Sequence, residues 1–158
     1  MKEYELVPIL IGLRWSHPPD AKFISTHFSS MVTNRILYTA CFVALTDTQR
    51  IAGYYTLASA CVPLIDLPTD TAKKLPRYPA VPTVRMGRLA VDQDFKGQGL
   101  GAALLADALD RAARSEVAAF ALLVDAKGDE AAAFYRHHGF IGLPESPLTL
   151  FLPLATVR

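Results

Sequence analysis

The residues of this chain that could do chemistry begin with a run of glycines in its second half. Gly97, Gly99 and Gly101 alternate with other residues, after an apolar run at 84–91 and within or just before an Ala- and Leu-rich run at 99–115. These runs predict a strand and a helix, joined by a loop whose Cβ-free backbone lets an anion approach. Unpaired N–H groups and the dipole at a helix N-terminus favour a phosphate. The segment therefore predicts a cradle for a pyrophosphate.

Other nucleotide loops fit this segment less well. A P-loop needs Lys followed by Ser or Thr after its last glycine, and neither follows Gly101. Gly97, Gly99 and Ala102 match the dinucleotide fingerprint, but the polar residues 92–96 separate them from the strand, and the motif lies past the middle of the chain. A plain helix cap is a further alternative, although it needs fewer glycines.

Two segments resemble motifs of the GCN5-related N-acetyltransferase (GNAT) superfamily. Residues 96–101, KGQGLG, resemble motif A, with Lys96 in place of the usual Gln or Arg; a hydrogen-bond donor is kept beside the phosphates. Residues 129–140, DEAAAFYRHHGF, resemble motif B. The resemblance runs from about Tyr38 to the C-terminus. It implies a single domain, 1–158, with the α/β three-layer GNAT fold, in which helices cover both faces of a central mixed sheet.

The resemblance also implies that the chain moves acetyl from acetyl-CoA to a primary amine, and it implies two sets of cofactor contacts. In the family, the strand before the loop is bulged and diverges from the next parallel strand, so its backbone is open to the pantetheine arm. The loop and the first helical turn hold the pyrophosphate. The strand contacts fall on Leu89, Ala90 and Val91, the loop contacts on Lys96, Gly97, Gln98, Gly99, Leu100, Gly101 and Ala102, and Phe134 of motif B is assigned to the cofactor as well, although its ring equally suits the core.

Tyr135 matches the family tyrosine that approaches the sulfur of CoA. A phenol has an unperturbed pKa of about 10, so it is protonated at neutral pH and can donate to a leaving thiolate as a general acid. His137 and His138, at the predicted helix end, suit contact with the last carbonyls rather than catalysis. The sequence identifies no general base; Asp66 and Glu145 are candidates only because they are acidic and close to expected substrate loops.

A narrower resemblance concerns the acceptor amine. Residues 51–59 and 75–92, and the tail from Phe134, are similar to GNAT toxins of toxin–antitoxin pairs, which acetylate the amino acid on charged tRNA. That resemblance implies aminoacyl-tRNA as substrate, a ribbon-helix-helix antitoxin as partner and a homodimer. An acetyltransferase for a small amine or a protein N-terminus, and a non-catalytic acyl-CoA-binding module, are the alternatives.

Binding a tRNA requires cations that replace the counterions of its phosphates. The net charge of the chain is only +1, so the distribution of charge has to supply the binding face. Ordinary solubilising charge and pairing with the CoA phosphates are the alternatives. The residues expected on this face are Lys73, Lys74, Arg77, Arg85, Arg88 and Arg136.

Composition limits the class of protein. A hydrophobic fraction of 51% and a charged fraction of 20% are those of a folded globular chain. No apolar run approaches the roughly 18 residues of a membrane helix, and the acidic N-terminus does not read as a signal peptide. The cytoplasm is therefore the expected compartment. Cys41 and Cys61 lack metal-site spacing and are expected to be buried, reduced thiols; no metal site is predicted.

Periodicity predicts the elements that position these residues. A polar turn at 46–50 joins two β-rich runs as a hairpin. Residues 63–82 hold five prolines and predict a long connection. Strands first, followed by alternating strands and helices, predict a mixed sheet with helices on both faces. The predicted strands are 4–11, 38–45, 51–58, 84–91, 118–125 and 149–152, and the predicted helices are 20–34 (one or two short ones), 69–75, 99–115 and 130–138.

Overall fold

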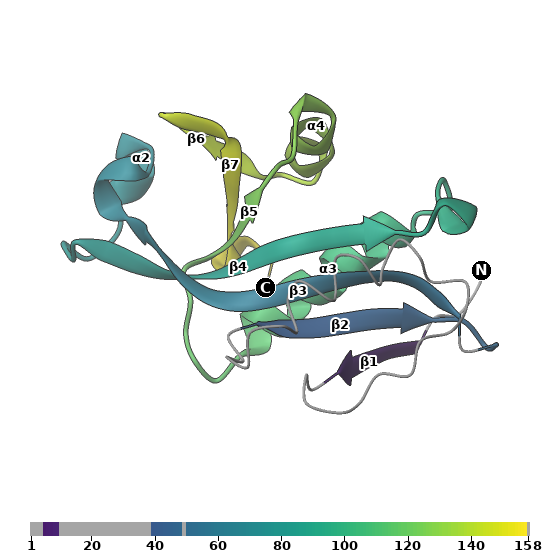
Figure 1. Ribbon diagram of the computed structural model, residues 1–158. Helices are drawn as coiled ribbons and strands as arrows, with labels where there is room; N and C mark the ends of the chain where they lie inside the picture. Colours follow the sequence, from purple (N-terminus) through teal and green to yellow (C-terminus); the bar gives the residue numbers. More distant parts are fainter. Residues whose placement is uncertain (1–4, 10–38, 49, 158) are drawn as a thin grey trace. The chain divides into compact units, whose positions relative to one another are not determined.

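The structure is a computed structural model, and it describes residues 5–9, 39–48 and 50–157 (Figure 1). The strands are β1 (Glu5–Ile9), β2 (Ala40–Leu45), β3 (Ile51–Pro63), β4 (Ala80–Val91), β5 (Ala121–Asp125), β6 (Ile141–Leu143) and β7 (Ser146–Pro153). The α-helices are α2 (Thr69–Ala72), α3 (Leu100–Arg114) and α4 (Asp129–His137), and the 3-10 helices are η1 (Leu64–Asp66), η2 (Gln93–Phe95) and η3 (Leu154–Thr156).

The sheet is mixed. Among the described strands, hydrogen-bonded neighbours follow the order β1-β2-β3-β4-β5-β7-β6. β1 and β2 are antiparallel, from Glu5 opposite Leu45 to Ile9 opposite Cys41. β4 and β5 are parallel, with Thr83 opposite Ala121 and Met86 opposite Val124. β7 runs antiparallel to both β5 and β6, so the sheet combines a parallel pair with antiparallel ones.

The chain forms two compact units, and β3, β4 and α3 each pass from one unit to the other. The first unit comprises Met1–Thr56 and Arg88–Leu104. Its described part holds a cluster of buried side chains from β2 and β3, namely Cys41, Val43, Ile51 and Tyr54. Burial raises the pKa of the Cys41 thiol to about 12, so this thiol is an inert part of the core.

The second unit comprises Leu57–Gly87 and Leu105–Arg158. One hydrophobic cluster in its described part joins seven buried side chains: Val62, Leu67, Val81, Ala121, Leu123, Leu143 and Phe151. Leu67, from the connection between β3 and β4, belongs to this cluster, and Leu64, Ala72 and Leu75 pack against it. The proline-rich connection is therefore anchored by its apolar side chains. α4 packs against β7 in the same unit (Figure 1).

The elements differ from the sequence expectations at their ends. β3 extends to Pro63 and β4 begins at Ala80, so the two strands take up both ends of the predicted connection. β6 was missed because three residues are too few for a periodic pattern. The helices expected at 20–34 lie outside the described residues. None of the described helices has the length and apolar character needed to cross a membrane.

The prediction that both cysteines are buried is wrong for Cys61. Cys41 is buried and Cys61 is exposed. Cys61 lies near the end of β3, where side chains alternate between the two faces and its neighbour Val62 points into the core. The apolar run around Cys61 therefore did not distinguish the two faces.

We expect Gly53→Ala to destabilise the first unit. A Cβ at this position in β3 would lie 2.8 Å from the Ala90 carbonyl oxygen and 2.9 Å from a methyl of Leu104. Such overpacking costs about 1–3 kcal/mol, which a urea unfolding curve would measure. Gly128→Ala is the control, since a Cβ there meets nothing within 4 Å; an equal loss in both variants would contradict the close-approach argument.

Candidate active site

The glycine loop lies in the first unit and leads into α3. Gly97 and Gly99 have positive φ values of +73° and +80°, which L side chains rarely adopt. A Cβ at either position would meet nothing within 4 Å, and Lys96 through Gly99 are exposed. The helix predicted at 99–115 is present as α3, which begins at Leu100, so Gly101 lies in its first turn.

This geometry fits a pyrophosphate. The first N–H groups of a helix have no intrahelical partner, and here an exposed glycine segment stands directly in front of them. The backbone of Gly97 and Gly99 takes a form that glycine favours, and it keeps the approach free of side chains. The loop can therefore bind an anion through main-chain donors, with the ammonium of Lys96 exposed beside them.

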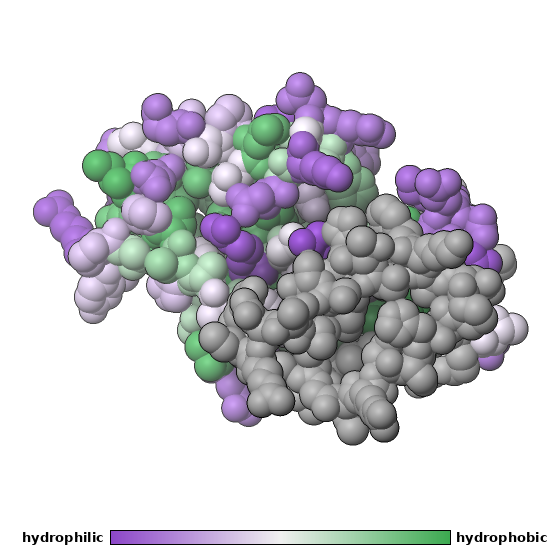
Figure 2. Space-filling view, in the orientation of Figure 1, coloured by the Kyte–Doolittle hydropathy of each residue, from purple (hydrophilic) through white to green (hydrophobic). Residues whose placement is uncertain are grey.

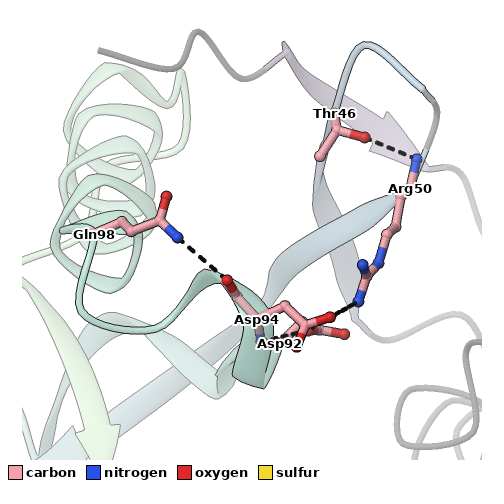
Figure 3. Close-up of polar contacts among 5 residues, drawn as sticks. All are labelled: Thr46, Arg50, Asp92, Asp94 and Gln98. Carbon is pink, nitrogen blue, oxygen red and sulfur yellow. Dashed lines mark hydrogen bonds and ion pairs between the residues drawn. The ribbon is translucent and has the colours of Figure 1, made fainter.

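A network of polar contacts shapes the turn before the loop (Figure 3). The Asp92 carboxylate accepts a hydrogen bond from the Asp94 N–H at 2.9 Å and so caps η2. The Arg50 guanidinium pairs with Asp92 at 3.3 Å and with Asp94 at 2.5 Å. The Gln98 amide donates to the Asp94 carbonyl at 3.2 Å. Gln98, predicted to contact the cofactor, thus directs its side chain back to the turn.

The residues expected to hold the pantetheine arm lie at the end of β4. Leu89, Ala90 and Val91 are half-buried, and Ala90 packs against the core cluster of the first unit. The Asp92 N–H donates to the Ala52 carbonyl at 2.9 Å, which fixes the chain as it leaves β4. The Ala90 side chain therefore belongs to the core, and we expect any contact of this segment with a cofactor to come from its backbone.

Tyr135 lies on α4, in the second unit, and is buried. Its ring stands 5.5 Å from the ring of Phe140 and makes an edge contact with Phe134 at 5.3 Å between centroids. Burial raises the pKa of the Tyr135 phenol to about 12. The phenol is therefore held in its protonated form, the form that a proton donor requires.

The other polar groups of α4 have structural contacts. A ring nitrogen of His138, Nδ1, lies 2.8 Å from the Phe134 carbonyl oxygen, so this histidine caps the helix end, as expected. The Arg136 guanidinium donates to the Pro147 carbonyl at 3.1 Å.

Asp66 and Glu145, the two acidic candidates for a general base, are both exposed.

The predicted cationic residues have different surroundings. Lys73, Lys74 and Arg77 are exposed on the connection between β3 and β4, and within the described residues they form no salt bridge. Arg85 pairs with Asp125 at 3.1 Å. Arg88 belongs to the first unit, whereas the other five predicted cationic residues belong to the second.

The same connection carries an open groove of about 670 Å³. Ile65 and Tyr78 line it and are 91% and 68% exposed, respectively, an unusual state for large apolar side chains. Lys73 and Arg77 line it too. Figure 2 shows hydrophobic and hydrophilic residues side by side over α2, at the upper left. No role was predicted for Ile65 or Tyr78, although apolar residues within a segment rich in prolines were a signal for them.

The comparisons with known proteins identify the family. The family model for the acetyltransferase (GNAT) domain matches residues 38–141. This chain belongs to the GNAT family of acetyltransferases. A relative from Mycobacterium tuberculosis, named tRNA-acetylating toxin, is 41% identical over 120 residues, which cover 75% of this chain and 70% of the relative.

Solved structures of a second relative, AtaT, match nearly the whole chain. AtaT complexed with acetyl-methionyl-tRNAfMet matches with a TM-score of 0.80 and 29% identity over 98% of this chain and 97% of that chain. AtaTR bound with AcCoA matches with a TM-score of 0.76 and 29% identity over 98% and 95%. An AtaT mutant toxin bound to the C-terminus of the antitoxin AtaR matches with a TM-score of 0.72 and 26% identity, over 98% of this chain and 95% of that chain.

These matches confirm the predicted α/β fold class and family. The chain is an acetyltransferase, and its cofactor is acetyl-CoA. Among the described residues, no group of three or more His, Cys, Asp or Glu side chains is arranged to hold a metal ion.

We expect Gly99→Ala to weaken acetyl-CoA binding. An L side chain at a φ of +80° costs about 1–2 kcal/mol, which relaxation of the loop would relieve by moving its N–H groups. The dissociation constant from calorimetry should rise roughly tenfold, with little change in stability because the loop is exposed. Gly99→Asn should bind better than Gly99→Ala, since Asn tolerates this conformation; equal binding by all three proteins would contradict the prediction.

Proposed function

We propose that this chain transfers acetyl from acetyl-CoA to the amino group of aminoacyl-tRNA and so blocks translation in the cytoplasm as a toxin. The observation that carries the proposal is the whole-chain similarity to AtaT, solved with acetyl-methionyl-tRNAfMet, alongside a closer relative named tRNA-acetylating toxin. The glycine loop, the protonated Tyr135 and the unpaired cations of the connection support it.

In this proposal the loop and Tyr135 have separate tasks. Acetyl-CoA supplies the acetyl group as a thioester that an amine attacks. Main-chain N–H groups after Gly97 and Gly99 would hold the pyrophosphate, and the backbone of residues 89–91 would hold the pantetheine arm. Tyr135 would donate the proton of its phenol to the leaving sulfur as the C–S bond breaks, and the proton released by the attacking amine would restore the phenol. The phenol carries this proton at neutral pH, as an unperturbed phenol would, and burial raises its pKa further.

The distribution of charge favours a polyanion despite the net charge of +1. Arg50, Arg85, Arg111 and Arg114 are neutralised by aspartates. Lys73, Lys74 and Arg77 have no such partner within the described residues, so their charge is available to phosphates. The nearby acidic residues Asp66 and Asp70 reduce this field without pairing with it. We infer that the connection between β3 and β4 contacts the tRNA.

The groove on that connection suits the unpaired 3′ end of a tRNA. Exposed bases stack on aromatic side chains, and Tyr78 is exposed beside the groove cations Lys73 and Arg77. Arg85, Arg88 and Arg136 stay in the proposed substrate set, with Arg85 and Arg136 partly engaged by their own contacts.

We also propose an antitoxin partner and a homodimer. AtaT is solved with the C-terminus of the antitoxin AtaR, and a partner of that class would control a translation-blocking enzyme. A ribbon-helix-helix domain in the partner and a two-fold pair of this chain are the specific forms proposed. A second copy would double the number of cations that one tRNA meets.

The first test is transfer of labelled acetyl from acetyl-CoA to bulk charged tRNA, comparing wild type with Tyr135→Phe. Phe keeps the packing against Phe134 and Phe140 and removes only the acid, so the rate should fall by about 10²–10⁴. Cofactor affinity should stay unchanged. Because the pKa of Tyr135 is about 12, wild-type kcat should show no loss due to this proton below about pH 11.

Three outcomes of that test are distinct. Label on the aminoacyl group that is lost with Tyr135→Phe supports both the substrate and the acid. Label that survives the substitution removes Tyr135 from the mechanism. Absence of label on tRNA, with acetyl-CoA bound, rejects aminoacyl-tRNA and turns the search to small amines and protein N-termini, or to a binding module if no amine is acetylated.

We expect the double variant Lys73→Ala, Arg77→Ala to bind tRNA at least about tenfold more weakly. The slope of log affinity against log salt should fall by about 1 to 2, since two phosphate contacts are lost. Arg111→Ala, Arg114→Ala is the control, because it removes the same charge from residues that already pair with Asp107 and Asp110. The same loss of slope in both double variants would show that only net charge matters.

A further inference from the structure

The turn before the glycine loop is tied to a distant part of the sequence. Asp92 and Asp94 flank the start of η2, one turn before Gly97, and both pair with Arg50. Arg50 lies just before β3, in the connection from β2, more than forty residues earlier in the chain. The guanidinium thus joins two segments of the first unit that meet only through the fold (Figure 3).

Arg50 is itself held in place. Its N–H donates to the Thr46 hydroxyl at 3.1 Å, and its carbonyl accepts from the Thr46 N–H at 2.9 Å. Its guanidinium carbon stands 5.2 Å from the centre of the ring of Phe95, which is buried under the turn. One guanidinium nitrogen, Nη2, therefore meets both carboxylates, while the planar face of the group lies over the Phe95 ring, a contact that suits Arg better than the point charge of Lys.

The network continues into the loop. The Asp92 carboxylate accepts from the N–H of Asp94, the second residue of η2, and the Asp94 carbonyl accepts from the side chain of Gln98, the residue between Gly97 and Gly99. A shift of the turn would therefore move both the start of the loop, at Lys96, and the residue between its two glycines. Donors aimed at an anion lose affinity when they are displaced by even a fraction of an ångström.

We propose that Arg50 is a positioning residue for acetyl-CoA, acting through Asp92, Asp94 and Gln98 to fix the pyrophosphate loop. It touches neither the cofactor nor the amine in this role. The inference rests on the assignment of the loop to the pyrophosphate in the proposed function, and it adds a residue outside both motifs.

Direct attraction between Arg50 and the phosphates is the competing explanation. The two aspartates outweigh the single positive charge of Arg50, so the cluster as a whole carries no surplus positive charge to offer an anion. The two explanations predict opposite effects for Asp94. If Arg50 acts by position, loss of the Asp94 charge loosens the turn and weakens binding. If only charge matters, the same loss frees Arg50 and strengthens binding.

The experiment measures the affinity and kinetics of acetyl-CoA for Arg50→Gln, Arg50→Lys and Asp94→Asn. Coupling through such a network is worth a factor of roughly 3 to 30, so Arg50→Gln should raise the dissociation constant and the KM for acetyl-CoA by that factor, with kcat unchanged. Asp94→Asn should weaken binding less, because Arg50 keeps Asp92. Arg50→Lys should fall between wild type and Arg50→Gln.

Arg114→Gln is the matched control. It breaks an exposed pair with an aspartate, Asp110 at 2.7 Å, at the far end of α3, and it should leave acetyl-CoA affinity unchanged. Thermal unfolding of each variant separates loss of the loop geometry from loss of the fold, and Asp94→Asn provides the second variant if Arg50→Gln is poorly folded.

Unchanged affinity in Arg50→Gln, or tighter binding in Asp94→Asn, overturns the inference. If Gly99→Ala still weakens acetyl-CoA binding, either result leaves the assignment of the loop to the pyrophosphate intact. If Gly99→Ala and Arg50→Gln both bind normally, the loop assignment itself fails and the positioning role fails with it.

Discussion

A phosphate can reach the N-terminus of a helix only where the backbone N–H groups face open space, and the start of α3 is built around that requirement. Gly97 and Gly99 hold positive φ values with no side chain in front of them. Gly53 must lack a side chain because a Cβ there would collide with the Ala90 carbonyl and with leucine side chains from the first turns of α3. Glycine thus leaves the loop open to an anion and lets β3 lie close to β4 and α3.

An open loop of this kind cannot order itself, because glycine loses more conformational freedom on folding than other residues. The polar network of Arg50, Asp92, Asp94 and Gln98, in the turn before the loop, restricts this conformational freedom. Exposed ion pairs are individually worth little, yet here one guanidinium meets two carboxylates and a ring, and the Asp92 carboxylate also caps the backbone of the turn. Geometry, rather than the strength of any one pair, is what this arrangement supplies.

The sequence revealed the parts whose chemistry is local. Periodicity and glycine spacing are short-range signals. They predicted the loop and the helices α3 and α4 with ends correct to a few residues. Contacts between distant segments could not be predicted from the sequence. No local pattern near Arg50 indicates that it pairs with Asp92 and Asp94. Likewise Cys61 and Val62 sit in one apolar run, and only the orientation of β3 decides which of them is buried.

Burial gives Tyr135 two properties at once. The rings of Phe134 and Phe140 remove its phenol from water, which stabilises α4 and raises the pKa of the same group to about 12. A surface tyrosine would keep its proton at neutral pH as well, but it would share that proton with solvent. An acid kept dry by its own packing can deliver the proton to a leaving group that water does not reach. The aromatic cluster that packs the end of α4 therefore also shields the phenol that the proposed reaction uses as its acid, and the raised pKa means that this phenol holds its proton more tightly.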